Sequence, residues 1–385
     1  MSVAGLADLP LHWGHVPPWL AAIMRRLARA IVKVIILDLG NEALLKRLSN
    51  PLWFQAFNNV IGMDWDSSGS TTVTTAILKE VLNDLNTDVR IAGGKGLLSR
   101  KTPEELLKYG EEVGLGSSRI NELVKISKLG AKADSVLLQD GFTLYHHALV
   151  FDRSGRWVII QQGMNTELRL ARRYHLAWYV SSDVTLEPHS GVVSDIRLTP
   201  LNLTHEKSVG ARSIIVDLVN EKPEKIKKNV VVINAVLKGN KTLLDLRPPR
   251  PIDNRVPYYR PVRLTGKLLR VLKEAYEVRP RNISELMLLT RVGPETLRAL
   301  SLISELIYRE PPPLMDPDSV PFSPFKYAFA IGGKDGIPYP VKREVAERVI
   351  LELEEMIKSA ELGSKEKLLA LKALKKLAPK DISMY

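Results

Sequence analysis

The sequence contains no cysteine among its 385 residues. Disulfide bonds, cysteine-ligated zinc, iron–sulfur clusters and thiol catalysis are therefore excluded. Small secreted proteins that depend on disulfides are excluded for the same reason. A lack of thiols together with many Ile, Val, Leu, Lys and Arg residues is typical of heat-adapted proteins, so we expect a thermophilic protein.

Long apolar runs are also absent. The most apolar stretch, Ile31–Leu39, is interrupted by Lys33 and Asp38 and is far shorter than the roughly 20 residues that span a bilayer. The first residues also lack a basic leader followed by the apolar core of a secretion signal. We therefore expect a cytoplasmic protein with no membrane partner.

Acidic residues are fewer than basic ones. There are 43 Asp and Glu against 55 Lys and Arg, so the formal net charge is +12 and the pI is about 9.6. Most of the excess lies in Lys207–Arg281, where 18 basic residues stand against 7 acidic ones. This balance predicts a polyanionic partner. We expect that partner to be nucleic acid, with DNA as the first choice. A basic heat-adapted surface without such a partner is the alternative.

Apolar patterning predicts an α+β fold, with a mainly helical N-terminal region that encloses a small antiparallel sheet. Thr143–Gly163 holds two β-rich runs joined by Asp152–Gly155, which predicts a hairpin. The Pro- and Arg-rich run Arg247–Arg263 is read as a linker or an extended basic arm. The predicted domains are a mixed domain at 1–206, a basic connecting segment at 207–262 and a helical unit at 263–385.

The stretch Leu288–Tyr308 (LLTRVGPETLRALSLISELIY) joins two apolar helices through a Gly-Pro turn. Asn282 and Glu285 predict a capping box for the first helix, and Pro294 suits the first position of the second. The turn resembles the helix-hairpin-helix motif of DNA repair proteins, with Arg291 in place of its first glycine. The second helix would then hold a DNA phosphate without reading sequence. A plain corner between helices is the alternative. The residues expected to bind nucleic acid here are Arg291, Val292, Gly293, Thr296 and Arg298.

A polar cluster lies on and beside the predicted hairpin. The catalytic candidates in it are Asp140, His146, His147, Gln161, Gln162 and His175, and Arg172 and Arg173 are expected to bind a phosphate. Neighbouring residues of a strand face opposite ways, so only one of each adjacent pair shares a face. Polar residues are costly to bury without hydrogen bonds, so one face is expected to line a site. A fully hydrogen-bonded sheet face is the alternative.

Asp64 and Asp66 flank a tryptophan in a polar turn and are further catalytic candidates. Two carboxylates at this spacing can hold a divalent ion, with Asp140 as a third oxygen ligand. Mg²⁺ or Mn²⁺ would be the cofactor of such a nuclease-like site. Helix capping by the two aspartates is the alternative. His12 and His15 could also be metal ligands or phosphate donors, although loop histidines are more often neither.

Two loops combine glycine with lysine, Gly93–Gly96 and Gly332–Gly336. Neither has the spacing of a Walker loop, so nucleotide hydrolysis is not predicted. The glycines would let the backbone approach a nucleic-acid phosphate, with Lys95 and Lys334 supplying charge. Ordinary turns are the alternative for both loops.

Several phrases that occur in order carry a resemblance to a known family. They include LHWGHVPPWL, MDWDSSGSTT, LQDGFTLYHHALVF and GGKDGIPYPV. Together they resemble the mostly archaeal family named domain of unknown function 763, over about Gly5–Val341. The resemblance implies no established reaction. Asp66 and Ile331 stand where the family usually has histidines, and Trp13 replaces a glycine. If those histidines were catalytic, this chain would bind without catalysis or use Asp66.

Together these patterns predict a DNA-binding protein of repair or processing, with a candidate site for phosphodiester cleavage or base excision. A base-excising enzyme would use Asp316, which follows Gly293 by 23 residues, near the spacing in helix-hairpin-helix glycosylases. Two alternatives stay open: a non-catalytic nucleic-acid binder, and an enzyme acting on a small phosphorylated or nucleotide substrate. The oligomeric state and the choice between DNA and RNA are not predicted.

Overall fold

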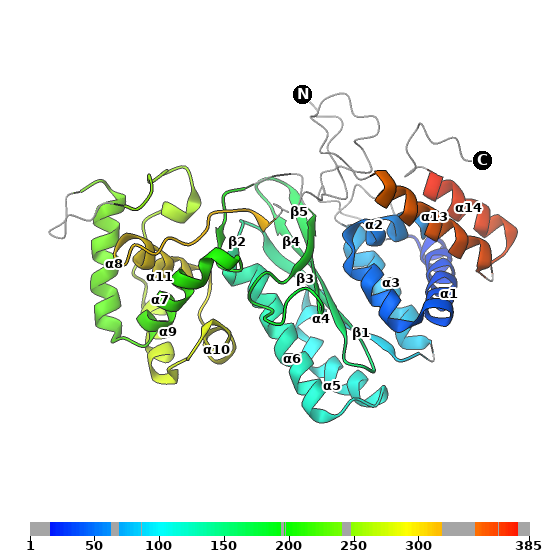
Figure 1. Cartoon of the computed structure of the whole chain (residues 1–385), viewed down its shortest axis with the longest axis horizontal. Coiled ribbons are helices and arrows are strands. Elements are labelled where there is room, and N and C mark those ends of the chain that lie inside the picture. Colours follow the sequence, from blue (N-terminus) through cyan, green and yellow to red (C-terminus); the bar gives the residue numbers. More distant parts are fainter. Residues whose placement is uncertain are drawn as a thin grey trace, which may run out of the picture.

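The computed structural model of the chain describes residues 16–62, 69–85, 87–193, 196, 198–240, 248–317, 343–360 and 362–375. They form a five-stranded antiparallel sheet and a two-stranded sheet, with helices before, between and after the strands (Figure 1). The predicted α+β class is confirmed. None of the helices in these ranges is long and apolar enough to cross a membrane.

Three helices open the described chain: α1 (Pro18–Ser49), α2 (Pro51–Val60) and α3 (Gly69–Asp84). A proline stands in the first turn of both α1 and α2, where a backbone N–H is not needed. Asn50 separates the two helices, and its side chain accepts hydrogen bonds from the first N–H groups of α2. Gly40, with φ of 84°, kinks α1 in a conformation that glycine adopts without strain.

The five-stranded sheet has the order β1-β3-β4-β5-β6, with every neighbouring pair antiparallel. Its strands are β1 (Val89–Lys95), β3 (Thr143–Asp152), β4 (Trp157–Asn165), β5 (Leu170–Ala177) and β6 (His189–Val193). β3 and β4 form the predicted hairpin. Asp152 fixes the turn because its carboxylate accepts from the N–H groups of Ser154 and Arg156.

Helices cover both faces of this sheet. Alternate residues such as Val150 and Ile160 pack with α1–α3, whereas their neighbours Leu149 and Ile159 pack with the helices that follow β1. Those helices are α4 (Leu97–Arg100), α5 (Thr102–Glu112) and α6 (Ser117–Lys132), which continues into a π-helical turn (Ala133–Leu137). The face against α1–α3 is called face A below, and the face against α5 and α6 face B.

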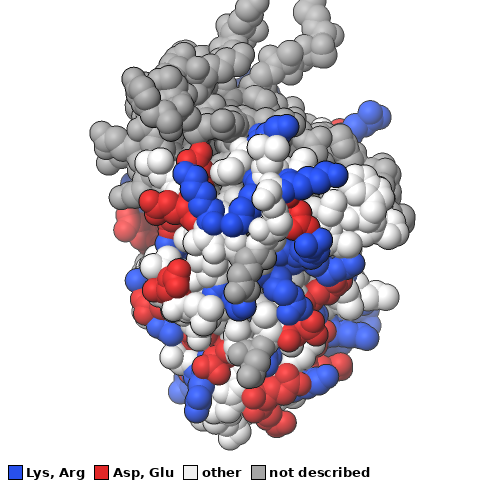
Figure 2. All heavy atoms as spheres, turned by 90° about the vertical axis from the view of Figure 1, so that its right-hand side faces the viewer, with Lys and Arg blue, Asp and Glu red and all other residues white. Residues whose placement is uncertain are grey.

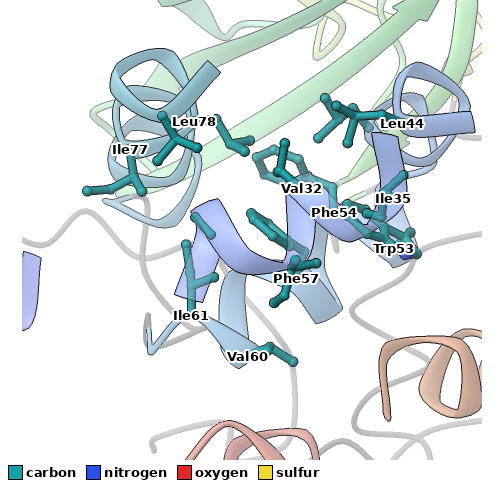
Figure 3. Packing of buried hydrophobic residues seen from close by; sticks show 14 of the residues in the cluster. Val32, Ile35, Leu44, Trp53, Phe54, Phe57, Val60, Ile61, Ile77 and Leu78 are labelled. Carbon is teal, nitrogen blue, oxygen red and sulfur yellow. The ribbon is translucent and has the colours of Figure 1, made fainter. Parts of the chain in front are cut away.

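The largest apolar cluster lies between α1, α2 and α3 (Figure 3). Trp53 and Phe57 of α2 stack with ring centroids 5.2 Å apart, and Phe54 is fully buried beside them. Each such side chain stabilises the fold by roughly 1.5–3 kcal/mol when it leaves water. Helices α13 (Arg343–Ser359) and α14 (Ser364–Lys375) return to this cluster and complete it.

The free edge of strand β1 is covered by side chains. Asn83 of α3 donates to the carbonyl oxygen of Ile91 and accepts from its N–H, at 3.2 and 3.0 Å. Lys79 donates to the carbonyl oxygen of Gly93, and Glu105 accepts from its N–H. Such pairing satisfies backbone groups that would otherwise recruit a strand of another chain.

A helical module lies at the other end of the molecule, at the left of Figure 1. It contains α7 (Val209–Val219), α8 (Pro223–Leu237), α9 (Gly266–Val278), α10 (Ile283–Leu289) and α11 (Pro294–Leu306), packed around one core. The segment 207–262, expected as a connection, thus contains two helices. The hydrophobic cores do not follow the domain boundaries that were predicted from composition. Helices α13 and α14 pack with α1 and α2 rather than with α9–α11.

Candidate functional site

The sheet separates the polar candidates of β3, β4 and β5 into two groups. On face A, the imidazole of His146 contacts the hydroxyl of Thr75 in α3 at 3.0 Å. On face B, the imidazole of His147 contacts the hydroxyl of Ser127 in α6 at 2.8 Å. Gln162 lies across from His146 in the ladder and Gln161 across from His147. The predicted alternation holds, so these candidates do not form one active site.

On face A, three polar side chains form a row across β3, β4 and β5: His146, Gln162 and Arg173. Each is buried. The outer two contact hydroxyls one turn apart on α3, since Arg173 donates to Thr71 at 3.4 Å and His146 contacts Thr75. The amide of Gln162 therefore lies between them, and neither its nitrogen nor its oxygen has a hydrogen-bond partner.

The hydrogen bonds of face A assign the protons of two histidines. Thr75 uses its hydroxyl proton on the carbonyl oxygen of Thr71, so it accepts from Nε2–H of His146. His175 donates from Nδ1–H to the carbonyl oxygen of Leu48 at 3.0 Å. The other ring nitrogen of each histidine is a buried acceptor without a partner.

Burial keeps both imidazoles neutral. Burial, with the electrostatic effect of nearby His147 and Lys95, lowers the pKa of His146 to about 3. Burial, with Arg173, lowers the pKa of His175 well below its usual value. Arg173 also loses basicity on burial, to a pKa of about 9. The cluster can therefore accept hydrogen bonds from a bound molecule, but its histidines do not take up a proton near neutral pH, and buried water is the ordinary occupant of such a place. Sets of three metal-ligating side chains are not found among the described residues.

On face B, the polar side chains form a continuous chain of hydrogen bonds that runs from Ser127 to His189. His147 contacts Ser127 and, through Nδ1, the side-chain oxygen of Gln161 at 2.8 Å. Gln161 donates to Asp134, whose second oxygen is 2.6 Å from the imidazole of His189. The order Ser–His–Gln is similar to a catalytic triad, but an amide cannot stabilise an imidazolium as a carboxylate does. Ser127, Gln161 and Asp134 are buried, so we interpret this chain as structural.

At the end of the sheet nearest the helical module, Arg172 pairs with two carboxylates. Its guanidinium lies 3.2 Å from Asp140 and donates two hydrogen bonds to Asp316. Tyr174 donates to Asp140 at 2.7 Å. Burial raises the pKa of Asp140, an effect that Arg172 opposes. Burial alone would lower the pKa of Arg172, but the two carboxylates outweigh it and raise that pKa. Arg172 faces away from Arg173, so the two do not bind one phosphate together.

The Gly-Pro turn between α10 and α11 is called the hinge below (Thr290–Pro294). Asn282 caps α10 by accepting from Glu285 N–H at 2.8 Å, as predicted, although the Glu285 side chain accepts from the N–H of Arg281 instead. Gly293 is the N-cap of α11 with extended backbone, and no side chain caps this helix. The first N–H groups of α11 are therefore free to bind an anion.

The hinge is held against the sheet by two hydrogen bonds to its carbonyl oxygens. Lys132 of α6 donates to the carbonyl oxygen of Val292 at 3.3 Å. Gln139 donates to that of Pro294 at 2.9 Å. Both bonds hold the start of α11 in place, and Gly293–Thr296 line a groove of about 1410 Å³ between the module and the sheet.

This groove, called the hinge groove, is lined by the hinge, the start of α9 and residues 253–265. These residues overlap the C-terminal part of the run Arg247–Arg263, and from here on the name basic arm refers to residues 253–265. Arg260 and Arg263 of the arm and Lys267 of α9 are exposed and line the groove. None of the three has an ion pair with a described residue. Arg291 is also exposed, but Glu274 accepts from its guanidinium at 2.9 Å. These four cations share the groove with the N-terminus of α11, and also with the carboxylates of Asp253 and Glu295.

The remaining predicted residues lie in different places. Arg298 is buried and donates to the carbonyl oxygens of Tyr258 and Arg260, so it shapes the basic arm from within. Val292 is buried in the hinge, and Thr296 is buried in the first turn of α11. Lys95 is exposed at the end of β1, away from the hinge groove. The candidates His12, His15, Asp64, Asp66 and Lys334 lie outside the described residues.

The comparisons with known proteins give one match. The family model described as Protein of unknown function (DUF763) matches residues 5–341. The chain belongs to this family. No curated protein and no solved structure matches it.

The sequence prediction did not single out Arg260, Arg263 or Lys267 as binding residues. The signal for the two arginines was present, because the run Arg247–Arg263 was read as a possible basic arm. The position of the two arginines beside the hinge depends on Glu305 of α11. Its carboxylate accepts hydrogen bonds from Arg250 and from the hydroxyl of Tyr259, which attaches the basic arm to α11. Contacts between residues so far apart in sequence leave no local pattern.

Proposed function

We propose that this protein binds DNA through the hinge groove and acts in DNA repair or processing. The observation that carries the proposal is that the uncapped N-terminus of α11 opens into the same groove as Arg260, Arg263 and Lys267. In this proposal α10 and α11 act as a helix-hairpin-helix. The N–H groups and positive dipole end of α11 hold one phosphate, and the three cations hold its neighbours along the strand.

The proposal is supported because Arg260, Arg263 and Lys267 have no ion pair with a described residue. At the opposite end of the molecule, shown in Figure 2, basic and acidic side chains are interspersed. There Arg25 pairs with Glu80 at 3.0 Å and Arg29 with Asp84 at 2.7 Å. An exposed cation without a carboxylate partner gives up no ion pair when it binds a phosphate. The groove therefore offers unused positive charge at one place, and contacts of this kind fix a DNA backbone without reading bases.

The proposal predicts a salt dependence. Each phosphate contact releases condensed counterions, so four contacts give a slope of roughly −3 to −4 in a plot of log affinity against log salt. Affinity should then fall by about a hundredfold between 50 and 200 mM salt. The readout is fluorescence anisotropy of labelled DNA titrated with protein at several salt concentrations.

A triple variant tests the place of binding. R260A/R263A/K267A should weaken binding and reduce the salt slope by about 3. The matched control is K222A/K227A/K228A, which removes three exposed charges around the start of α8, outside the groove. Equal effects of the two variants would contradict binding in the hinge groove. Running the same DNA on denaturing gels with Mg²⁺ or Mn²⁺ shows whether strands are cut.

The structure does not favour Asp316 as the catalytic carboxylate of a glycosylase. Both of its oxygens accept hydrogen bonds, from Arg172 and from the N–H of Leu198, and it is buried. A glycosylase aspartate must face the excised base. Asp316 instead joins the segment after α11 to the sheet.

A further inference from the structure

The hinge groove has its cations on one side only, whereas each wall carries two carboxylates: Asp253 and Glu295 on the module, Asp140 and Glu167 on the sheet. All the Lys and Arg residues among its described lining belong to the module: Arg255, Arg260, Arg263, Lys267, Arg291 and Arg298. The sheet side is formed by Gln139–Gly141, by Asn165, Glu167 and Leu168 at the turn between β4 and β5, and by Leu198–Leu201. That wall contributes two carboxylates and no cation among the described residues.

A duplex carries phosphates on both of its strands. If it lay in the hinge groove, one strand would face Arg260 and Arg263, and the other would face the sheet wall. There the exposed carboxylate of Glu167 would repel phosphates, and no described lining residue would neutralise them. A single strand has one backbone, which can lie wholly on the module wall. Its bases would then point at the sheet wall.

The sheet wall suits bases better than phosphates. Leu168 is 46% exposed at the tip of the turn, and Leu198 also belongs to the lining of this wall. The amide of Asn165 donates to the carbonyl oxygen of Gly141 and accepts from the N–H groups of Glu167 and Leu168, which holds this turn in place. Single-strand sites combine a cationic groove for the backbone with side chains, usually aromatic, on which the bases stack without being read. Here Leu168 and Leu198 provide the apolar surface for the bases. The module wall of the hinge groove supplies the cations, and the sheet wall supplies the apolar surface.

The wall positions are fixed in the free protein. Asp316 bonds to Arg172 and to Leu198 N–H, and Gln139 bonds to the hinge. Opening the groove to admit a duplex would break these contacts. We propose that the hinge groove binds single-stranded DNA in preference to duplex DNA, with the backbone on the module wall and the bases against the Leu168 wall. This inference rests on the proposed function.

The test compares one labelled 20-nucleotide strand with its duplex, at matched salt. Wild type should bind the single strand at least about tenfold more tightly, and L168A should weaken single-strand binding. E167K places a cation on the sheet wall and should narrow the ratio of the two affinities by about threefold or more, since one more phosphate contact becomes possible. The matched control is E104K, the same charge change on an exposed site of α5.

The outcomes separate the two claims. A single-strand preference that E167K narrows and E104K leaves unchanged supports the inference. Equal or tighter binding of duplex would overturn the single-strand inference and leave DNA binding intact. A preference that both lysine variants narrow equally would also overturn it, because the effect would then come from net charge. Absence of binding to either DNA at low salt would overturn the proposed function itself.

Discussion

The carboxylate of Asp316 accepts two hydrogen bonds from the guanidinium of Arg172, a residue 144 positions earlier in the chain. Both side chains are buried, with exposed fractions of 7% and 0%. Asp316 lies in the segment that returns from α11 to the sheet, and Asn202 holds the same segment by donating to the carbonyl oxygen of Met315. This pair therefore fixes the position of the helical module, and with it the width of the hinge groove.

Replacing Asp316 should lower the stability of the fold. In D316N the side chain keeps its shape but loses its charge, and Arg172 retains only Asp140. Breaking a buried ion pair commonly costs about 3 kcal/mol or more because a desolvated charge is left poorly compensated. Urea unfolding followed by circular dichroism measures the loss. The control is D253N, which removes the partner of Arg255, a side chain that is 90% exposed, and should leave stability almost unchanged. Equal losses would contradict the role given to Asp316.

Removing Asn83 should expose the edge of β1. N83A leaves the N–H and carbonyl oxygen of Ile91 without their partner, at a cost of roughly 1–3 kcal/mol. An uncovered edge can also pair with another chain, so association should increase with protein concentration. Light scattering during a concentration series detects this. D84A, next along α3 and engaged in a surface ion pair, is the control and should stay as monodisperse as wild type.

Acid should destabilise the protein through the histidines of face A. The pKa of His146 falls from 6.5 to about 3 on folding, so the unfolded chain binds the proton first. Its contribution to stability is complete above pH 6.5 and is lost as the pH falls toward 3. The slope is about 1.4 kcal/mol per pH unit for each such histidine. His175, whose pKa is also lowered, adds to it.

Unfolding free energies measured between pH 7 and pH 4 check this sign. H146Q removes the titrating group, so its stability should be less sensitive to pH than that of wild type over this window. H205Q, at a histidine outside the sheet, is the control and should keep the wild-type slope. If H146Q and wild type showed parallel curves, the protonation states assigned to face A would be wrong.

Local signals explain why some elements were predictable. Asn282, Gly293 and Pro294 carry their structural meaning within a few residues, and the α10–α11 turn formed as expected. The β3–β4 hairpin likewise followed from alternating apolar residues and from the turn at Asp152. For His146 and His147, the period of two was enough to predict opposite faces.

Partners far apart in sequence were not predictable. Thr75 is 71 residues from His146, and no pattern in the chain pairs them. Charge alone marked Arg172 and Arg173 as phosphate ligands, but the structure buries both, because carboxylates and hydroxyls from other elements compensate them. Composition also could not show that α13 and α14 pack with α1. Each of these depends on the tertiary arrangement.

The most direct test of DNA binding at the hinge replaces Gly293. A Cβ at this position would meet no atom within 4 Å, and its backbone is extended, so any residue fits. In G293D the carboxylate would cap α11, occupying the N–H groups proposed to hold a phosphate and repelling the phosphate itself. Stability should stay equal or rise by roughly 0.3 kcal/mol, because Asp is a good N-cap.

Anisotropy titrations of wild type, G293A and G293D with the same DNA give the answer, with unfolding curves measured in parallel. The account predicts that G293A binds like wild type, while G293D is at least as stable as wild type and binds about tenfold or more weakly, a difference of about 1.4 kcal/mol. If G293D binds as tightly as G293A, no phosphate lies at the N-terminus of α11, and the hinge is only a corner between two helices.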